Sequence, residues 1–270
     1  MAAAEAAATP DRDAMRLTVI GLGEAGRLYA QGAVAAGYVV TGYDPFAPDE
    51  PAGVARAATL ADAVASADIV LTLTAASLSE QIAAEAAPEL RADATYVDCT
   101  TASPEVLARV AEVIEAAGPA FADVAILGPV PIRGAATDAI VSGSGRRVAT
   151  ETLRSFGATV EDGGDVAGDA SARKLLRSIL MKGLGAIITE ALAAGRAAGS
   201  EQWIRGQIAR QLAGDGHAVV ERLERGTRLH AVRRAHEMAA VAEYLESLGV
   251  AHDMATATQH THERLAAEQE

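Results

Sequence analysis

One short stretch, residues 16–26 with the sequence RLTVIGLGEAG, constrains the fold of this chain more than any other. The apolar run at 17–20 predicts a strand, which leads directly into the pattern Gly21-x-Gly23-x-x-Gly26. The first glycine permits a tight turn off the strand, and the second lets a phosphate approach the backbone. The third lets the following helix pack close to the sheet. Backbone N–H groups and the positive end of the helix dipole then favour a pyrophosphate at this turn.

The residues that follow supply the context that a glycine pattern alone lacks. Small and apolar residues recur at helical spacing from 25 to 36, and Gly37 stands where a helix C-cap belongs. A second strand is predicted at 38–43, and Asp44 at its end lies where an acid binds the ribose 2′-hydroxyl of a dinucleotide. The alternative is an ordinary glycine-rich turn with a solvated aspartate, which does not require strand, turn, helix, strand and acid in this order. The sequence therefore predicts a dinucleotide-binding site.

The cofactor predicted for this site is NAD, with NADP as the alternative. Asp44 can accept hydrogen bonds from both ribose hydroxyls, and its charge would repel a 2′-phosphate. The loop at 45–51 adds Asp49 and Glu50 and contains no Lys or Arg, so we expect no cation nearby. The predicted cofactor-binding residues are Gly21, Leu22, Gly23, Glu24, Ala25, Gly26, Asp44, Thr74, Ala75 and Thr100.

Length and charge restrict the classes of partner. A chain of 270 residues suits one large domain or two modest ones. Its net charge of −13 argues against a nucleic-acid groove or an anionic membrane surface. No apolar run approaches the roughly 20 residues needed to span a bilayer. Residues 1–14 lack the features of a signal peptide and predict a disordered tail, with Met15 as a candidate start. These features favour a cytoplasmic protein that binds neither nucleic acid nor membrane.

Strands and helical stretches alternate as far as residue 164. Such alternation predicts an α/β fold with a mostly parallel, doubly wound sheet of Rossmann type. Beyond the first two strands, further strands are predicted at 68–74, 95–100, 121–126, 139–142 and 158–161, and helices at 60–66, 78–87 and from 104 onward.

Past residue 164 the sequence predicts helices alone. The first, at about 168–199, has apolar residues around much of its circumference and would be about 48 Å long and largely buried. The others are expected at 201–213, 218–224, 227–248 and 254–267. The chain is therefore predicted to contain a nucleotide-binding domain at 1–164 and an all-helical domain at 165–270. Alanine-rich helices with few aromatics leave apolar faces to cover, which predicts a homodimer.

The start of the long helix is a candidate for the chemistry. In open α/β sheets a ligand lies outside the carboxyl ends of the strands, and this helix has to pass nearby. A nicotinamide supplies the hydride, so the protein has to supply a proton donor or acceptor. Lys174 in an apolar helix suits that role, because burial lowers the pKa of a lysine toward working pH. Alternatively, the stem of Lys174 packs while its head reaches water.

Four segments resemble the β-hydroxyacid dehydrogenase family, which includes 3-hydroxyisobutyrate and 6-phosphogluconate dehydrogenases. IGLGEAG resembles the family's G-L-G-x-M-G opening, and DCTTASP at 98–104 resembles its D-x-S-T-x-x-P segment. FADVAILGPVPIRGA at 121–135 resembles its substrate loop, and GDASARKLLRS at 168–178 resembles the helix that carries a catalytic lysine. The resemblance runs from Arg16 nearly to the C-terminus and implies that Lys174 is the catalytic residue.

Departures from the family pattern fall on the substrate side. The usual S-G-G becomes Leu127-Gly128-Pro129, which removes a serine that binds substrate carboxylate. The usual N-N becomes Arg177-Ser178, and a late Lys-Asp pair becomes His236-Glu237. These variants resemble a branch labelled 6-phosphogluconate-dehydrogenase-like, with its own C-terminal domain. The resemblance implies that reaction type carries over while the substrate does not. The substrate-binding residues that it implies are Gly128, Pro129, Arg177, Ser178 and Glu237.

The remaining candidates favour structural roles. All six histidines fall between His217 and His262 without metal-ligand spacing, so solvated helix faces explain them better than a metal site. Cys99, the only cysteine, excludes an intrachain disulfide and is expected to be a small buried residue. Arg133 beside the substrate loop is either a surface charge or a group that holds an anion. Arg146, Arg147 and Arg173 are also treated as surface charges.

Three functions are consistent with these observations. The first is an NAD(P)-dependent oxidoreductase that acts on CH–OH groups, in which hydride moves between nicotinamide and a small hydroxy acid or its carbonyl form, and Lys174 exchanges the proton. The second is an imine reductase, but those enzymes usually lack a lysine at the Lys174 position. The third is a non-catalytic dinucleotide sensor, which would combine an intact Asp44 with an inactive Lys174 site. Nothing in the sequence indicates inactivation.

Overall fold

The computed structural model describes residues 15–269, so the predicted disorder of residues 1–14 lies outside the described residues. By its internal contacts the chain divides into two units, which meet between Arg177 and Ser178. The predicted boundary at residue 164 falls at the end of the last strand, whereas the contacts divide the chain inside the helix that follows. Each unit is described by itself.

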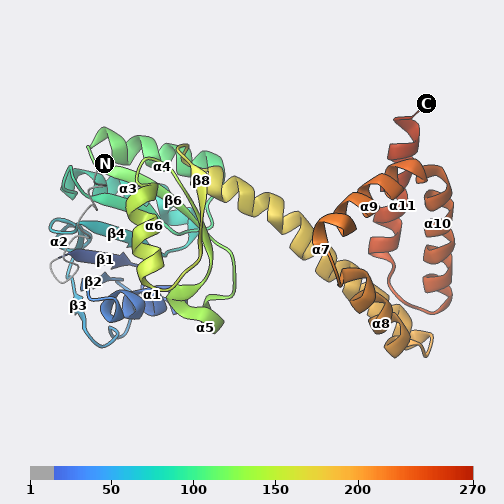
Figure 1. Cartoon of the computed structure of the whole chain (residues 1–270). Coiled ribbons are helices and arrows are strands. Elements are labelled where there is room, and N and C mark those ends of the chain that lie inside the picture. Colours follow the sequence, from blue (N-terminus) through green and yellow to red (C-terminus); the bar gives the residue numbers. More distant parts are fainter. Residues whose placement is uncertain (1–14, 270) are drawn as a thin grey trace, which may run out of the picture. The chain divides into compact units, whose positions relative to one another are not determined.

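The first unit is built on an eight-stranded sheet in the order β3-β2-β1-β4-β5-β6-β7-β8 (Figure 1). Neighbouring strands run parallel except β6 and β7, which are antiparallel. Strand order reverses direction between β1 and β4, which is the switch point where α/β sheets bind ligands. The strands are β1 (Arg16–Ile20), β2 (Val39–Tyr43), β3 (Val54–Arg56), β4 (Ile69–Thr72), β5 (Thr95–Asp98), β6 (Ala120–Ile126), β7 (Ala139–Ser142) and β8 (Val160–Gly164).

Helices cover both faces of this sheet. Side chains alternate between the faces, so Leu17 and Val19 of β1 join one buried cluster while Ile20 joins the other. The first cluster packs against Tyr29 of α1, and the second against Leu107 of α4. The predicted α/β fold with a doubly wound sheet is confirmed. The helices are α1 (Glu24–Ala35), α2 (Leu60–Val64), α3 (Ser79–Ala86), α4 (Pro104–Ala116), α5 (Val130–Arg133) and α6 (Arg146–Ser155).

Strand β3 was missed by the sequence analysis. It has three residues, it lies at the edge of the sheet beside β2, and two of its side chains are exposed. A short exposed edge strand carries no alternating apolar pattern, which is the signal that strand prediction uses.

The described part of the second unit is helical throughout, as predicted. Helix α7 (Asp169–Ala197) begins in the first unit and continues into the second. It is followed by α8 (Glu201–Leu212), α9 (Gly216–Leu229), α10 (Ala231–Ser247) and α11 (Asp253–Ala267). Helix α9 is longer than predicted and α10 begins later. Asp215 caps the start of α9 by accepting a hydrogen bond from the His217 N–H at 2.9 Å, and the helices separate at His230.

The prediction that the long helix is largely buried was wrong. Along α7, Leu176 is 68% exposed, Ile179 75% and Leu180 64%. Just 6% of its most apolar window is buried, and by length and composition α7 is long and apolar enough to cross a membrane. The expectation that no stretch approaches a membrane span is therefore corrected for this helix, although core helices of soluble proteins meet the same criterion. The apolar pattern was read correctly, but such a pattern does not report whether its side chains are covered.

Candidate dinucleotide and proton-transfer site

The glycine turn between β1 and α1 has the backbone that the pattern requires. Gly21 has φ +88°, and a Cβ there would lie 2.7 Å from the Leu73 carbonyl oxygen. A Cβ on Gly26 would collide with the carbonyl oxygen of Gly21, so this glycine lets the helix pack on the turn itself. By contrast, a Cβ on Gly23 would meet nothing within 4 Å. Gly21 and Gly26 therefore shape the turn, and Gly23 leaves open space beside the first turn of α1.

Asp44 connects the end of β2 to this turn. Its Oδ2 accepts a hydrogen bond from the Leu22 N–H at 2.8 Å, and its Oδ1 accepts one from the Phe46 N–H at 2.9 Å. Each carboxylate oxygen keeps a further lone pair for a ligand. The acid therefore fixes the glycine turn and remains available to a ribose.

A cleft of about 580 Å³ opens where the glycine turn meets the ends of β2 and β4. Its volume suits a small-molecule site, and its position is the switch point of the sheet. Phe46, 91% exposed, stands at the cleft, and α3 contributes residues that include Gln81 and Glu85. Thr74 Oγ1 is buried and has no hydrogen-bond partner among the described residues, which suits a ligand that supplies one. The predicted cofactor residues that line the cleft are Gly21, Gly23, Asp44, Thr74 and Ala75.

The other predicted cofactor residues have different positions. Leu22 is buried and gives its N–H to Asp44, while Glu24 and Ala25 open helix α1, for which Gly23 provides no side-chain cap. Thr100 is buried away from the cleft lining. Its Oγ1 lies 2.9 Å from Ser79 Oγ and accepts a hydrogen bond from the Ala102 N–H at 3.3 Å, so its side chain supports the loop after β5.

The expectation of no cation near the 45–51 loop was wrong. Arg56 of β3 donates to the Ala47 carbonyl oxygen at 3.2 Å and pairs with Glu50 at 2.5 Å. Arg27 of α1 donates to Asp49 at 3.1 Å. Both arginines lie outside the loop in sequence, so the loop's own composition could not reveal them. The two acids neutralise these cations.

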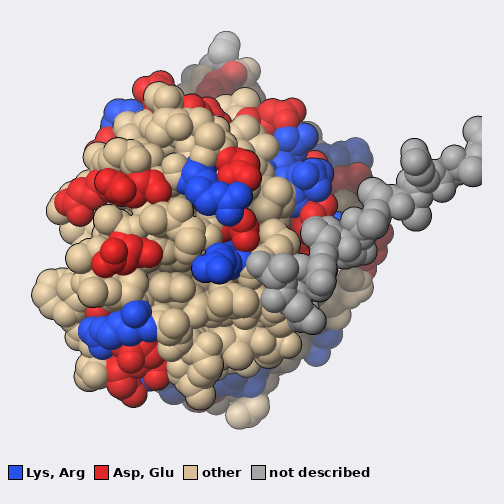
Figure 2. Space-filling view, turned by 90° about the vertical axis from the view of Figure 1, so that its left-hand side faces the viewer, with Lys and Arg blue, Asp and Glu red and all other residues tan. Residues whose placement is uncertain are grey.

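Figure 2 shows acidic and basic side chains interspersed over one face of the first unit. The arginines treated as surface charges each have an acidic partner there or elsewhere in the unit. Arg146 pairs with Asp165, Arg147 with Glu151 at 3.0 Å, and Arg173 with Glu161 at 3.7 Å. The exclusion of nucleic acid stays a prediction from net charge.

Lys174 stands in the second turn of α7 and is partly buried. Burial raises the pKa of Cys99, the residue that follows β5, and the charge of Lys174 is a smaller, opposing effect. Burial and the charges of Asp98 and Asp123 act more strongly, so the pKa of Cys99 is raised well above its ordinary value. Ser171, three residues before Lys174, donates a hydrogen bond from its hydroxyl to the Ala102 carbonyl oxygen at 2.9 Å, which holds the start of α7 at the carboxyl end of β5. Cys99 itself is a buried thiol, as predicted, and its raised pKa argues against a nucleophile.

A buried polar row at the start of α7 was missed by sequence reasoning. Asp98 of β5 pairs in register with Asp123 of β6, which pairs with Ser142 of β7. Burial raises the pKa of Asp123 to about 6, and the charge of Asp98 adds to this, while hydrogen bonds from Ser171 and Ser142 oppose it. Burial also raises the pKa of Asp98. Charged residues inside otherwise apolar strands were the available signal.

The predicted substrate loop follows β6. Pro129 precedes helix α5, and a Cβ on Gly128 would meet the Thr137 methyl at 3.2 Å. Arg133 donates to Asp138 at 3.0 Å, so a partner within the loop holds the cation that was considered for anion binding. Ile132 of the same turn is largely exposed.

The other predicted substrate residues belong to α7 and the second unit. Arg177 is exposed and ends the first unit. Ser178 begins the second, and its Oγ accepts a hydrogen bond from Lys182 Nζ at 3.0 Å. Glu237 of α10 is exposed and pairs with Arg233 on the same helix. The structure brings Lys174, Arg177 and Ser178 onto consecutive turns of one helix.

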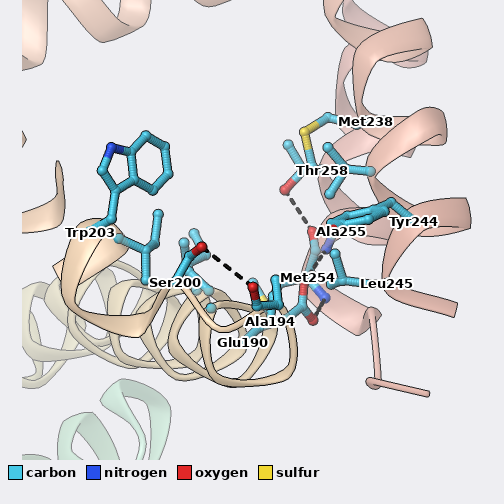
Figure 3. Close-up of a pocket in the computed structure, with 16 residues that line it drawn as sticks. Glu190, Ala194, Ser200, Trp203, Met238, Tyr244, Leu245, Met254, Ala255 and Thr258 are labelled. Atoms are coloured by element: carbon cyan, nitrogen blue, oxygen red, sulfur yellow. Dashed lines mark hydrogen bonds between the residues drawn. The ribbon is translucent and has the colours of Figure 1, made fainter. Parts of the chain in front are cut away.

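A separate cavity of about 400 Å³ lies within the second unit (Figure 3). Trp203, Met238 and Tyr244 line it, and most of its walls are apolar. Glu190 of α7 accepts hydrogen bonds from the N–H groups of Met254 at 2.7 Å and Ala255 at 2.8 Å. This carboxylate therefore caps the start of α11 and fixes one wall of the cavity.

One histidine differs from the prediction of solvated helix faces. His262 is buried, and burial together with the charge of Arg234 lowers its pKa, against an opposing effect of Glu237. Within residues 15–269, no group of three or more His, Cys, Asp or Glu side chains is arranged to hold a metal ion.

Comparison with known families explains this geometry. Residues 16–163, more than half of the chain, match the family described as the NAD binding domain of 6-phosphogluconate dehydrogenase. The chain belongs to this family. Residues 196–265 match a second family, described as a domain of unknown function (DUF1932). The resemblance to hydroxyacid dehydrogenases with a separate C-terminal domain is confirmed, and the protein is an NAD(P)-binding member of an oxidoreductase family.

Solved structures share the fold over most of their length. The conserved protein MTH1747, of unknown function and described as structurally similar to 3-hydroxyacid dehydrogenases, is 27% identical with a TM-score of 0.64. The match covers 94% of this chain and 98% of that one. The Streptomyces aurantiacus imine reductase is 20% identical with a TM-score of 0.81, over 94% and 95% of the two chains. An imine reductase variant from Myxococcus stipitatus in complex with NAD+ is 23% identical with a TM-score of 0.79, over 94% of each chain. No curated protein matched the sequence.

Proposed function

We propose that this protein is an NAD(P)-dependent dehydrogenase or reductase that interconverts a small hydroxy acid and its carbonyl form, with Lys174 as general acid and base. The observation that carries the proposal is the position of Lys174. It is partly buried, and it follows by three residues Ser171, whose hydroxyl donates to the Ala102 carbonyl oxygen after β5 at 2.9 Å, at the strand ends where an open α/β sheet binds its ligand.

The cofactor, when bound, supplies or accepts the hydride. The protein binds the cofactor and transfers the proton. The open backbone at Gly23 and the first-turn N–H groups of α1 suit the pyrophosphate, and Asp44 suits the ribose hydroxyls. Lys174 Nζ gives a proton to the substrate oxygen during reduction and takes it during oxidation. A lysine can serve here because its ammonium exchanges a proton, whereas an arginine stays protonated at neutral pH.

On the substrate side, Arg177 and Ser178 follow Lys174 by three and four residues, so all three face one side of the helix. Arg177 is exposed and suits an anionic group of the substrate. In the loop Leu127 replaces a carboxylate-binding serine and Pro129 replaces a glycine, and Glu237 replaces an aspartate late in the chain. These exchanges support a substrate that differs from those of the named dehydrogenases.

A second candidate is reduction of a C=N bond. Likeness to imine reductases over 94% of the chain favours it, but at 20% identity that likeness concerns the fold. Lys174 argues against it, since the resemblance stated above implies that imine reductases usually lack this lysine. A non-catalytic sensor, the third candidate, would bind the dinucleotide without turnover.

One assay separates the three candidates. Hydroxy acids, oxo acids and cyclic imines are tested with both nicotinamide cofactors, following nicotinamide absorbance, with wild-type protein and Lys174→Ala. Turnover of a hydroxy or oxo acid that depends on Lys174 supports the proposal. Turnover of imines alone would refute it in favour of the second candidate. Tight dinucleotide binding with no turnover across the panel would favour the sensor.

The homodimer is likewise part of the proposal, together with a cytoplasmic location. Exposed apolar side chains along α7 need a covering surface, and an isologous pair of subunits is the commonest solution. Light scattering at micromolar concentration measures the mass, and a monomer there would refute the dimer. Separation of soluble and membrane fractions tests the location, because a membrane-spanning α7 would put the protein in the membrane fraction.

A further inference from the structure

Asp123 of β6 is a carboxylate buried at the start of α7. It is 1% exposed, and its Oδ2 accepts hydrogen bonds from the Ser171 N–H at 2.9 Å and from the Ser142 hydroxyl at 3.3 Å. Ser171 belongs to the first turn of α7, whose N–H groups have no partners inside the helix. Asp123 therefore caps the helix that carries Lys174.

Ser142 completes the cap. Its Oγ accepts a hydrogen bond from the Ala170 N–H at 3.0 Å while its hydroxyl donates to Asp123. Ser142 and Asp123 are directly opposite each other in the antiparallel pair of β7 and β6, so their side chains share one face of the sheet. The Ser171 hydroxyl in turn donates to the Ala102 carbonyl oxygen, after β5, at 2.9 Å. Residues from three neighbouring strands and their loops thus hold one helical turn.

The entry to α7 is equally restricted. Gly168 has φ +95°, and a Cβ there would lie 2.7 Å from the Pro104 carbonyl oxygen, so the chain passes tightly against α4 before the helix begins. An exposed Ser or Asp would satisfy the same N–H groups without the cost of burying a carboxylate. The burial of Asp123, which raises its pKa to about 6, is therefore an expensive way to cap a helix and favours a role in geometry over one in stability.

We propose that Asp123 and Ser142 are positioning residues that fix Lys174 in its place for proton transfer by clamping the first turn of α7. Lys174 follows Ala170 by four residues and Ser171 by three, so it lies one turn further along the same face. A rotation or slip of the clamped turn is carried directly to the lysine. The proposal rests on the proposed role of Lys174 and adds the device that holds it.

The first test needs no substrate. Lys174 and Lys182 are the chain's only lysines, so reductive methylation with ¹³C-formaldehyde gives two lysine NMR signals, assigned with Lys182→Arg. Asp123→Ala should shift or broaden the Lys174 signal and leave that of Lys182 unchanged. Ser142→Ala, which keeps the Asp123 charge, should move the same signal. Asp123→Asn keeps an acceptor for the Ser171 N–H and should stay near wild type. Equal shifts in Asp123→Asn and Asp123→Ala would assign the effect to charge and overturn the clamp.

The second test uses the best substrate of the panel. Asp123→Ala should lower kcat about 10- to 100-fold, because a displacement of about 1 Å costs on that order, with KM changed less than about twofold. Asp123→Asn should restore most of kcat. In a Lys174→Ala background, Asp123→Ala should lower the residual rate less than about twofold. A loss of the same factor in both backgrounds would show a general structural role and contradict the proposal.

Ser144→Ala is the matched control. Its Oγ accepts a hydrogen bond from the Phe121 N–H at 3.0 Å, so it removes a bond between the same strand and loop without touching α7. It should change neither the Lys174 signal nor kcat. If no panel compound is turned over, the proposed function fails while the NMR series still decides the clamp. If turnover depends on Lys174 but the NMR signal ignores Asp123 and Ser142, the clamp fails alone.

Discussion

The two units of this chain bury their apolar side chains to very different extents. In the first, Leu17 and Leu71 of neighbouring strands are fully buried in one of the two core clusters of the sheet. In the second, Trp203 on α8 and Val232 on α10 are exposed, as are Ile179, Leu180 and Ile187 of α7. The first unit therefore forms a complete core from its own sequence, whereas the second leaves apolar surface that soluble monomers rarely expose. This difference is the reason that a covering surface is proposed for the helical unit.

The largest expected effect concerns the helix that joins the two units. Lys174→Ala should lower turnover about 10²–10⁴-fold, or some 3–5 kcal/mol of barrier, because general acid–base catalysis contributes on that order. NAD affinity and melting temperature should barely change, since Lys174 does not line the cofactor cleft. Lys174→Arg should be nearly as damaging. Steady-state kinetics with parallel NAD titration measure both.

Lys182→Ala is the control for this prediction, on the side of α7 that belongs to the second unit. Lys182 is rotated about 80° from Lys174 on an ideal helix. It donates a hydrogen bond to Ser178, so a small loss is expected, about tenfold or less. An inactive Lys182→Ala beside an active Lys174→Ala would mean that the helix has been aligned wrongly with its family.

One added charge on α7 tests whether a second subunit covers its exposed apolar side chains. Ile179→Glu on α7 should convert the proposed dimer to monomers and lower the melting temperature, because a carboxylate cannot be buried in an apolar interface without a partner. Val113→Glu on α4 is the control, since Val113 is partly exposed in the first unit and should tolerate a charge. Light scattering and thermal melting measure both variants. A wild-type protein that requires detergent and sediments with membranes would instead support a membrane role for α7.

What the sequence predicted well has local causes. Backbone requirements predict the glycine turn and Asp44, and apolar runs predict the buried strands. Their predicted positions were therefore correct to within a few residues. The helix expected from residue 104 likewise begins at Pro104, where Ser103 accepts a hydrogen bond from the Val106 N–H. Lys174 was selected by resemblance and by its place in an apolar helix, and its catalytic role stays a prediction.

What the sequence could not supply depends on tertiary structure. Arg27 and Arg56 reach the 45–51 loop from α1 and β3, and no local pattern connects them to it. Asp123 is separated from Ser171 by 48 residues, so its capping role appears only when the strands are in register. The exposure of α7 follows from what its neighbours leave uncovered, which helical periodicity does not report. Features with a local sequence pattern were therefore predictable, whereas side-chain contacts between residues far apart in the sequence were not.

A pH measurement tests the buried carboxylate of the first unit. Because burial raises the folded-state pKa of Asp123 from 3.8 to about 6, the folded state binds this proton more tightly than the unfolded chain. The resulting stability is fully present below about pH 4 and is lost as pH rises through about 6. Asp123→Asn should remove this dependence and be more stable than wild type at pH 8 by about 2–3 kcal/mol. Urea unfolding of both proteins at a series of pH values measures this dependence. Equal slopes of the unfolding free energy against pH in wild type and Asp123→Asn would contradict the prediction.

The smallest expected effect concerns cofactor choice, which lies entirely within the first unit. NAD should bind more tightly than NADP by about tenfold, or 1.4 kcal/mol, because Asp44 would repel a 2′-phosphate at the cleft. Glu50→Gln should narrow the difference in affinity between NAD and NADP, because it releases Arg56 to attract a 2′-phosphate. In the wild type Arg56 pairs with Glu50 at 2.5 Å and donates a hydrogen bond to the Ala47 carbonyl oxygen of the loop. Asp93→Asn removes an acid from Arg91 at a distant site and serves as the control, with no change in either affinity. Dissociation constants of both cofactors, measured by calorimetry for each protein, test this preference. Tighter NADPH binding by the wild-type protein would refute the assignment, and an unchanged ratio in Glu50→Gln would show that Arg56 cannot reach the ribose.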